Sequence, residues 1–173
     1  KEKSVDIVIT TYNRPDRLAQ IVNNLSQQTN MDFNLIINDD GGKDRINPSD
    51  FSVITKYIWN EDVGYHRVGR FNESVSMCVS PNIILLDDDC IPHFREFVQS
   101  HLNELQNFDT CRGIVQFPDG ARANSWFSTA NLGIRKSVID KIGLFDPMFD
   151  GHYGHEDQDL GNRIKENNYS VQK

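Results

Sequence analysis

Three consecutive carboxylates, Asp87, Asp88 and Asp89, are the residues of this chain most suited to chemistry. They follow residues 83–86 (Ile-Ile-Leu-Leu), an apolar run that is typical of a buried strand. Carboxylates this close together repel one another, so a cation is needed to keep all of them ionised. Their hard oxygen atoms suit Mg²⁺ or Mn²⁺. The triplet therefore indicates a divalent-metal site at a strand end, and the alternative is a solvated acidic loop.

A second acidic cluster lies near the C-terminal end, in Gly154-His155-Glu156-Asp157-Gln158-Asp159-Leu160. It follows an aromatic and histidine-rich stretch, residues 149–154, that could shape a pocket. A carboxylate in such a pocket can act as a general base toward a hydroxyl group. The alternative is that these acids only cap a helix, because the helix dipole favours negative charge in the first turn.

Strand and helix patterns alternate along the chain and must position these residues. β-branched or apolar runs predict strands over residues 5–10, 33–38, 53–59, 83–86, 113–117 and 130–134. Apolar residues at helical spacing predict helices that begin near Pro15 and Glu156, and others over residues 68–79, 94–105 and 137–142. A last element starts at Ser170. Such alternation implies right-handed crossovers, so we expect a single α/β domain, Rossmann-like, with a mostly parallel central sheet flanked by helices.

Three polar segments follow predicted strands: residues 10–13, 39–40 and 87–89. The carboxyl ends of parallel strands meet in one crevice, so these segments should converge there. The sequence has neither of the phosphate-binding signatures GxGxxG and GxxxxGK[ST]. A nucleotide would therefore need a metal on Asp89 and an arginine, Arg67 or Arg70, to hold its phosphates.

Composition narrows the class of protein. At 173 residues the chain fits one domain, and its net charge of -7 argues against a general nucleic-acid binder. Three cysteines without a CxxC pair fit a reducing compartment, so we expect a cytoplasmic protein that can work at the inner face of the membrane. No run is long enough to span a bilayer and no signal peptide is visible. Because the chain begins Lys1-Glu2-Lys3 without Met, we expect a piece of a longer protein.

Four segments in this order and spacing resemble the motifs of family 2 glycosyltransferases, which have the GT-A fold. They are residues 8–15 (Val-Ile-Thr-Thr-Tyr-Asn-Arg-Pro), 38–42 (Asn-Asp-Asp-Gly-Gly), 85–89 (Leu-Leu-Asp-Asp-Asp) and 154–160. The last is also similar to the galactosyltransferase and polypeptide N-acetylgalactosaminyltransferase type. The resemblance covers about residues 5–165.

The resemblance implies roles for the matched residues. Asp40 would bind the base, most often uracil in this family, and Asp39 would be structural. The triplet would serve as the DxD motif, with Asp89 and Asp87 as ligands of Mn²⁺ or Mg²⁺. The residues expected to contact the nucleotide are Thr10, Tyr12, Arg14, Asp40, Arg67, Arg70, Asp87 and Asp88.

The acceptor side follows from the same resemblance. Asp157 would be the general base, and Glu156 would help to position the acceptor. Trp126 and Asn131 would complete the acceptor side, although an aromatic in that loop could equally cover the core. Residues 1–117 would form the nucleotide-binding half and residues 118–173 the acceptor half, truncated at the C-terminus.

The implied function is inverting, metal-dependent sugar transfer from a nucleoside-diphosphate sugar, UDP-linked by expectation, to a hydroxyl of a saccharide or glycolipid acceptor. Surface polysaccharide or glycoconjugate synthesis is the expected setting. One alternative is an inactive or truncated nucleotide-sugar-binding module. Another is a sugar nucleotidyltransferase, which would want a glycine-rich basic loop that Asn13-Arg14-Pro15 does not supply.

Overall fold

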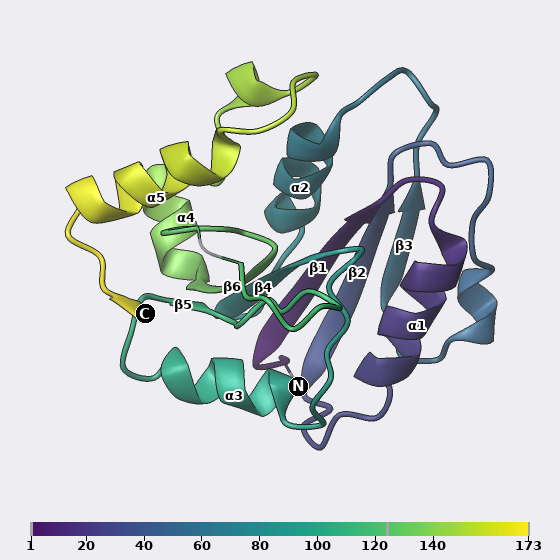
Figure 1. Ribbon diagram of the computed structural model, residues 1–173, viewed down its shortest axis with the longest axis horizontal. Coiled ribbons are helices and arrows are strands. Elements are labelled where there is room, and N and C mark those ends of the chain that lie inside the picture. The colour runs from purple at the N-terminus through teal and green to yellow at the C-terminus, as the bar shows by residue number, and fades with distance from the viewer. Residues whose placement is uncertain (1, 124, 173) are drawn as a thin grey trace.

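Seven strands and five α-helices alternate along the chain in the computed structural model, which describes residues 2–123 and 125–172 (Figure 1). The strands are β1 (Val5–Thr11), β2 (Phe33–Asp39), β3 (Lys56–Trp59), β4 (Asn82–Asp87), β5 (Thr110–Arg112), β6 (Asn131–Arg135) and β7 (Val171–Gln172). The helices are α1 (Pro15–Leu25), α2 (Arg67–Ser76), α3 (Phe97–Glu104), α4 (Lys136–Ile142) and α5 (Glu156–Glu166), with 3-10 turns at Pro48–Asp50 and Pro147–Phe149.

The strands form one sheet in the order β3-β2-β1-β4-β6-β5-β7. The first four are parallel to one another, whereas β6 runs antiparallel to both β4 and β5. In this register Thr10 of β1 lies between Asn38 of β2 and Asp87 of β4. The carboxyl ends of the three central strands are therefore level, and the polar segments that follow them share one edge, as predicted.

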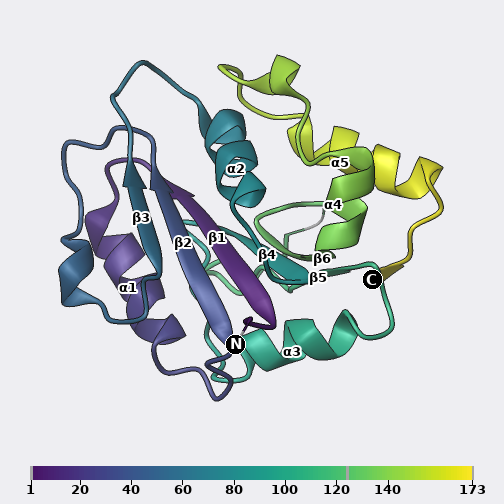
Figure 2. The same ribbon diagram turned by 180° about the vertical axis from the view of Figure 1, so that it is seen from behind.

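Helices cover both faces of the sheet (Figures 1 and 2). On one face α1 and α3 pack against alternate strand residues such as Ile7, Ile9 and Leu86. On the other face α2, α4 and α5 pack against the intervening residues, such as Val8 and Leu85. Because both faces are buried, the central strands read as continuous apolar runs. The predicted α/β architecture is confirmed.

Several predicted boundaries were wrong. Residues 113–117 form no named strand, only an isolated bridge between Gln116 and Arg122. The strand β5 lies before them, where β6 and β7 offer partners. Ile114 and Phe117 are exposed, so the apolar pattern there reflects no burial. The helix predicted from residue 94 begins at Phe97, and Phe94 is 77% exposed. β3 begins at Lys56 rather than at residue 53, and α2 ends at Ser76.

The element expected from Ser170 is β7, and Lys173 lies outside the described residues. The cysteines Cys78, Cys90 and Cys111 are free. Within residues 2–123 and 125–172, no helix combines the length and the apolar character that a membrane crossing requires.

Candidate active site

The acidic triplet separates at the end of β4 into three carboxylates with different partners. Asp87 accepts a hydrogen bond from Arg67 Nη2 at 2.6 Å, on the face covered by α2 and α5. Asp88 is buried and accepts bonds from Thr11 Oγ1 at 2.9 Å and Arg14 Nη1 at 2.8 Å. The Asp89 side chain is about half exposed, with Arg14 at 3.6 Å. The triplet is thus part of a built site and not a solvated loop.

The electrostatic surroundings of Asp87 favour a nearby cation. Burial raises the pKa of the Asp87 carboxyl, and although Arg67 lowers it, Asp89 and Asp157 raise it again. Arg67 is the counter-charge that the structure supplies. Its own pKa is raised, because the charges of Asp87, Asp157 and Glu156 outweigh the effect of its burial.

Arg67 joins the two acidic clusters. It is the first residue of α2, and its guanidinium stacks over Phe71 with 4.9 Å between the group and the ring centroid. While Nη2 bonds Asp87, Nη1 donates to Glu156 Oε1 at 2.7 Å. Arg67 thus lies 20 positions from Asp87 and 89 positions from Glu156 in the sequence, and it brings the two acidic clusters together.

Glu156 and Asp157 open α5 but do not cap it. The residue before the helix, His155, has a left-handed backbone and makes no side-chain cap. Asp157 instead accepts bonds from Thr129 Oγ1 at 2.6 Å and Thr129 N at 3.2 Å. Both acids thus make tertiary contacts toward the sheet edge, so helix capping alone does not account for them.

The acids after β2 are both engaged. Asp39 accepts bonds from Gly42 N and from the Tyr57 hydroxyl, which fits the structural role predicted for it. Asp40 accepts from Arg70 Nε at 2.7 Å and from the backbone N–H of His66 at 2.8 Å. Asp40 and Arg70, predicted separately as nucleotide contacts, are therefore a buried ion pair.

Around Asp40 lie the aromatic residues on the predicted nucleoside side. Tyr12 is about half exposed, and its hydroxyl donates to Asp62 Oδ2 at 2.9 Å. Trp59 is also exposed and stacks with Arg45. Thr10 is buried, and the hydroxyl that reaches the triplet belongs to Thr11, which the sequence interpretation missed.

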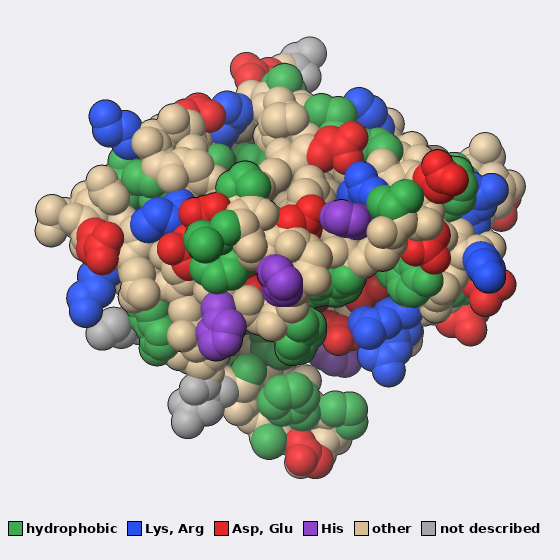
Figure 3. Space-filling view, turned by 90° about the horizontal axis from the view of Figure 1, so that it is seen from above, with side chains coloured by type: hydrophobic (Ala, Val, Ile, Leu, Met, Phe, Trp, Pro, Cys, Tyr) green, Lys and Arg blue, Asp and Glu red, His purple; other side chains and the backbone are tan. Residues whose placement is uncertain are grey.

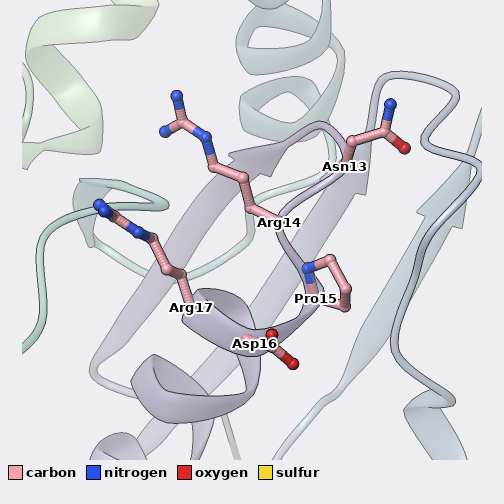
Figure 4. A pocket seen from close by; sticks show the side chains of 5 residues that line it. All are labelled: Asn13, Arg14, Pro15, Asp16 and Arg17. Atoms are coloured by element: carbon pink, nitrogen blue, oxygen red, sulfur yellow. The ribbon is translucent and has the colours of Figure 1, made fainter.

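A hollow of about 300 Å³ opens beside the triplet, lined by residues 13–17. Figure 4 shows that Arg14 and Arg17 extend to the same side of the start of α1, whereas Asn13 points to the other side. Arg14 is the residue that reaches Asp88 and Asp89. This placement is compatible with the nucleotide role predicted for Arg14.

The two residues predicted to complete the acceptor side lie on opposite faces of the sheet. Trp126 is half exposed, lies next to Phe127, and would contact any side chain at Gly161 of α5. Phe127 is buried, so the core-covering alternative holds for it. The Asn131 side chain accepts from His101 Nε2 at 2.8 Å beneath α3. The structure does not bring Asn131 to Asp157, so its acceptor role stays a prediction without geometric support.

Two exposed tyrosines lie near this side of the site; Tyr153 belongs to the aromatic stretch predicted to shape a pocket, whereas Tyr65 was not predicted. Tyr65 and Tyr153 have ring centroids 6.4 Å apart. Burial raises the pKa of Tyr65, while Arg67 lowers it and Glu156 raises it, which places the hydroxyl near the acidic clusters. Figure 3 views the molecule from this edge and shows acidic, basic and histidine side chains close together. In the described ranges, no three His, Cys, Asp or Glu side chains form a ready-made metal cluster.

Comparison with known proteins identifies the family. The model of glycosyl transferase family 2 matches residues 6–155. The chain belongs to glycosyl transferase family 2. The match includes the triplet and ends one residue before Glu156.

Relatives of this family 2 chain include enzymes. Validoxylamine A glucosyltransferase of Streptomyces hygroscopicus subsp. jinggangensis is 29% identical over 215 aligned positions, which cover 92% of this chain and 51% of the relative. Hyaluronan synthase of Pasteurella multocida is 22% identical, with 92% of this chain and 22% of the synthase covered. The chain thus spans about half the length of the glucosyltransferase and less than a quarter of the synthase.

Solved structures confirm the GT-A fold expected of family 2. The mannosyltransferase PcManGT from Pyrobaculum calidifontis, in complex with GDP-Man and Mn²⁺, superposes with a TM-score of 0.77 at 15% identity. The superposition covers 99% of this chain and 54% of the mannosyltransferase. S. aureus TarS 1-349 in complex with UDP-GlcNAc has a TM-score of 0.75 at 14% identity, covering 97% of this chain and 55% of TarS 1-349.

Proposed function

We propose that this chain is the catalytic part of an inverting, metal-dependent glycosyltransferase. Its donor would be a nucleoside-diphosphate sugar, UDP-linked, and its acceptor a hydroxyl of a saccharide or glycolipid. The observation that carries the proposal is the Arg67 bridge, which holds Asp87 of the triplet and Glu156 beside Asp157 within hydrogen-bond distance of one guanidinium. A donor-side and an acceptor-side acidic group therefore face the same space.

Asp87 and Asp89 are the residues that would hold Mn²⁺ or Mg²⁺. Both offer hard oxygen atoms, and the raised pKa of Asp87 reflects surroundings in which a cation would be stabilising. Since no ready-made cluster of three ligands exists among the described residues, phosphate oxygens and water would complete the coordination, as is usual for Mg²⁺. When bound, the ion neutralises charge on the diphosphate.

Asp157 would take the proton of the acceptor hydroxyl as that oxygen bonds the anomeric carbon. The bond between the anomeric carbon and the diphosphate oxygen breaks, and the nucleoside diphosphate leaves with the electron pair. Attack opposite the leaving group inverts the anomeric centre. Thr129 fixes the orientation of Asp157, and a positioned carboxylate is an effective general base.

Glu156 would bind the acceptor beside this base. Its Oε1 is held by Arg67, whereas Oε2 is buried without a hydrogen-bond partner among the described residues. A buried acceptor atom without a donor is costly. An acceptor hydroxyl would supply that donor, which supports the role expected for Glu156.

Nucleotide binding tests the donor side. UDP-, GDP- and dTDP-sugars are titrated calorimetrically into the purified chain with and without Mn²⁺. We expect the UDP-sugar to bind best, and only with the metal, and Asp89→Asn to weaken that binding at least about tenfold because a charged ligand is lost. A preference for GDP- or dTDP-sugars would contradict the uridine assignment, and equal binding without Mn²⁺ would contradict metal dependence.

The variant Asp157→Asn tests the acceptor side. We expect turnover to fall at least about 100-fold, the usual contribution of a general base, while nucleotide affinity stays unchanged. Asp159→Asn is the matched control, because Asp159 lies on the same helix but pairs with Arg163. Turnover of that control should stay within about twofold, since Asp159 pairs with Arg163 of its own helix and does not bond Thr129 or Arg67. Full turnover of Asp157→Asn would show that Asp157 is not the base.

A further inference from the structure

The N-terminus of α2 is capped by a carboxylate from a distant segment. His66 precedes the helix, but its side chain makes no capping bond. Instead, Asp150 Oδ1 accepts a hydrogen bond from the backbone N–H of Gly69, in the first turn, at 3.0 Å. The other oxygen, Asp150 Oδ2, lies 2.8 Å from His66 Nδ1, although 84 positions separate the two residues. A carboxylate here satisfies a free helix N–H and complements the helix dipole.

Gly69 allows this close approach. A Cβ at this position would lie 2.8 Å from Asp150 Oδ2, nearer than such atoms come in real proteins. The backbone N–H of His66 is held at the same time by Asp40 Oδ2 at 2.8 Å. The start of α2 therefore binds one acid from the end of β2 and one from the segment that leads to α5.

The segment between Asp150 and α5 has an unusual backbone. Gly151, Gly154 and His155 all have positive φ angles, of 76°, 92° and 74°. Such angles are uncommon outside glycine. A backbone of this kind does not by itself specify where the following helix starts. α5 also lacks a side-chain N-cap. Local structure alone therefore does not determine where Glu156 and Asp157 lie.

Besides the bonds from Thr129 to Asp157, two tethers to α2 determine the position of these acids. Asp150 is held by His66 and Gly69, and Glu156 is held by the next residue along, Arg67. His66, just before α2, and Arg67 and Gly69, in its first turn, thus hold both ends of the segment. Because Asp157 follows Glu156 directly, the tethers also determine how far Asp157 lies from the donor side.

We propose that His66 and Asp150 form a positioning pair that fixes the segment leading to Asp157 against the start of α2. Neither residue reacts, and the pair acts through Asp157. The effect of the pair on catalysis rests on the proposed function. The effect of the pair on the order of the segment is independent of that function. Losing the pair would leave the donor side in place and let the predicted base move away from it.

The charge of His66 strengthens this contact. The hydrogen bond to Asp150 raises the pKa of His66, burial opposes this, and Asp150 and Asp40 raise it further while Arg70 lowers it. A hollow of about 390 Å³ is lined by His66 and Asp150 together with Glu73 and Arg70. Burial alone would raise the pKa of Asp150, but His66 and Gly69 lower it overall. The ionised pair therefore persists from the lowered pKa of Asp150 to the raised pKa of His66, and is lost as the pH rises through the latter.

Hydrogen exchange tests the structural part without any substrate. Amide exchange of His152 and Asp159, whose N–H groups donate to Phe149 O and His155 O, is compared at pH 7 in the wild type, in Asp150→Ala and in the control Asp146→Ala. Asp146 caps the neighbouring 3-10 turn by accepting a hydrogen bond from Met148 N. We expect exchange to accelerate about five- to thirtyfold in Asp150→Ala, the factor for loss of a cap, and to stay at the wild-type rate in the control.

A conservative variant protects the test against misfolding. Asp150→Asn keeps an acceptor for Gly69 N but loses the charge, so exchange should accelerate less than in Asp150→Ala. Its His66, followed by NMR titration, should titrate closer to the ordinary value of about 6.5. Wild-type exchange in both Asp150 variants would overturn the proposal, and so would an unchanged His66 titration.

Kinetics test the catalytic consequence. With the donor that the wild type turns over, Asp150→Asn and His66→Gln should lower kcat while the donor KM stays within about twofold, because the donor side is intact. The fall of kcat at alkaline pH should move to lower pH in Asp150→Asn, whose His66 loses its proton earlier. A rise in donor KM with unchanged kcat would overturn the positioning role. If the wild type itself has no transferase activity, the proposed function fails, and the exchange result still decides the pairing.

Discussion

The carboxylates of the site are held by donors that come from several elements. Thr11 and Arg14, at the end of β1 and the start of α1, hold Asp88, and Thr129 holds Asp157. Arg67 bonds acids from both acidic clusters, Asp87 and Glu156. Since it is largely buried, its charge cannot be replaced by solvent. Arg67 is therefore the residue on which both the stability and the geometry of the site depend most.

Arg67→Met should lower the free energy of unfolding by about 3–5 kcal/mol, because two buried carboxylates lose their partner. Urea denaturation at pH 7 measures the change. The loss should shrink at acid pH, where a neutral carboxyl no longer needs a counter-charge. Lys136→Met is the control, since Lys136 pairs with the exposed Asp140 on α4 and should matter by less than about 1 kcal/mol. Equal losses in the two variants would contradict the role of Arg67.

Whether a site residue could be predicted depended on how far away its partners lie in the sequence. Asp40, Asp87 and Asp157 could be placed at one sheet edge because each follows a recognisable strand end or opens a helix. His66, Thr129 and Asp150 could not, because their roles arise from partners 28 to 84 positions away. Thr11 had a weak signal, since strand alternation turns it to the face opposite Thr10.

Among the elements, those with a fully buried stripe were predictable. In α1 the apolar residues at helical spacing are all buried: Leu18, Ile21, Val22 and Leu25. The strand predicted over residues 113–117 failed because exposed Ile114 and Phe117 imitate a buried pattern without a partner strand. β5 and β7 are short; β5 depends on pairing with β6 and β7, and β7 on pairing with β5, which no local pattern encodes. Non-local pairing, more than local propensity, thus limited the prediction of this half of the sheet.

The packing of α5 against the loop before β6 can be tested at Gly161. A Cβ there would lie 2.7 Å from the Trp126 ring and 2.8 Å from that of Phe127. Glycine to alanine in a helix usually stabilises by about 1 kcal/mol, but here overpacking against buried Phe127 should reverse the sign. We expect Gly161→Ala to destabilise by about 1–3 kcal/mol in thermal or urea unfolding.

Asn162→Ala is the matched control, because Asn162 is the exposed neighbour on the same helix. It should be neutral or slightly stabilising, since alanine has the better helix propensity. If Gly161→Ala stabilises the protein as much as the control does, α5 does not press on Trp126 and Phe127 as described.

At the scale of the whole molecule, two histidines give the stability opposite dependences on pH. His66 is half-exposed and paired with Asp150, so its raised pKa makes it stabilising at neutral and mildly acid pH. His101 lies on the buried side of α3, on the opposite face of the sheet, where burial lowers its pKa to about 4. Its Nε2–H donates to Asn131, and Nδ1 lies 3.2 Å from Cys111 Sγ. The two faces of the sheet thus respond differently to acid.

The neutral His101 makes a definite prediction for acid unfolding. In the unfolded chain it titrates near its ordinary value of about 6.5, whereas in the fold it stays neutral down to about pH 4. Protons then bind the unfolded state preferentially, so its contribution is present above about pH 6.5 and is lost as the pH falls toward 4. The loss integrates to about 3 kcal/mol.

His101→Gln removes this titration while keeping a group that can donate to Asn131. Its free energy of unfolding should be lower than that of the wild type at pH 7, because the buried ring contacts are lost. Between pH 6.5 and 4, however, its stability should fall by about 3 kcal/mol less than that of the wild type. Urea denaturation across that range measures both curves, and subtracting them removes the shared contribution of the acids. His93→Gln, at an exposed position, should follow the wild-type slope, and parallel curves for His101→Gln and the wild type would mean that His101 is protonated in the folded protein.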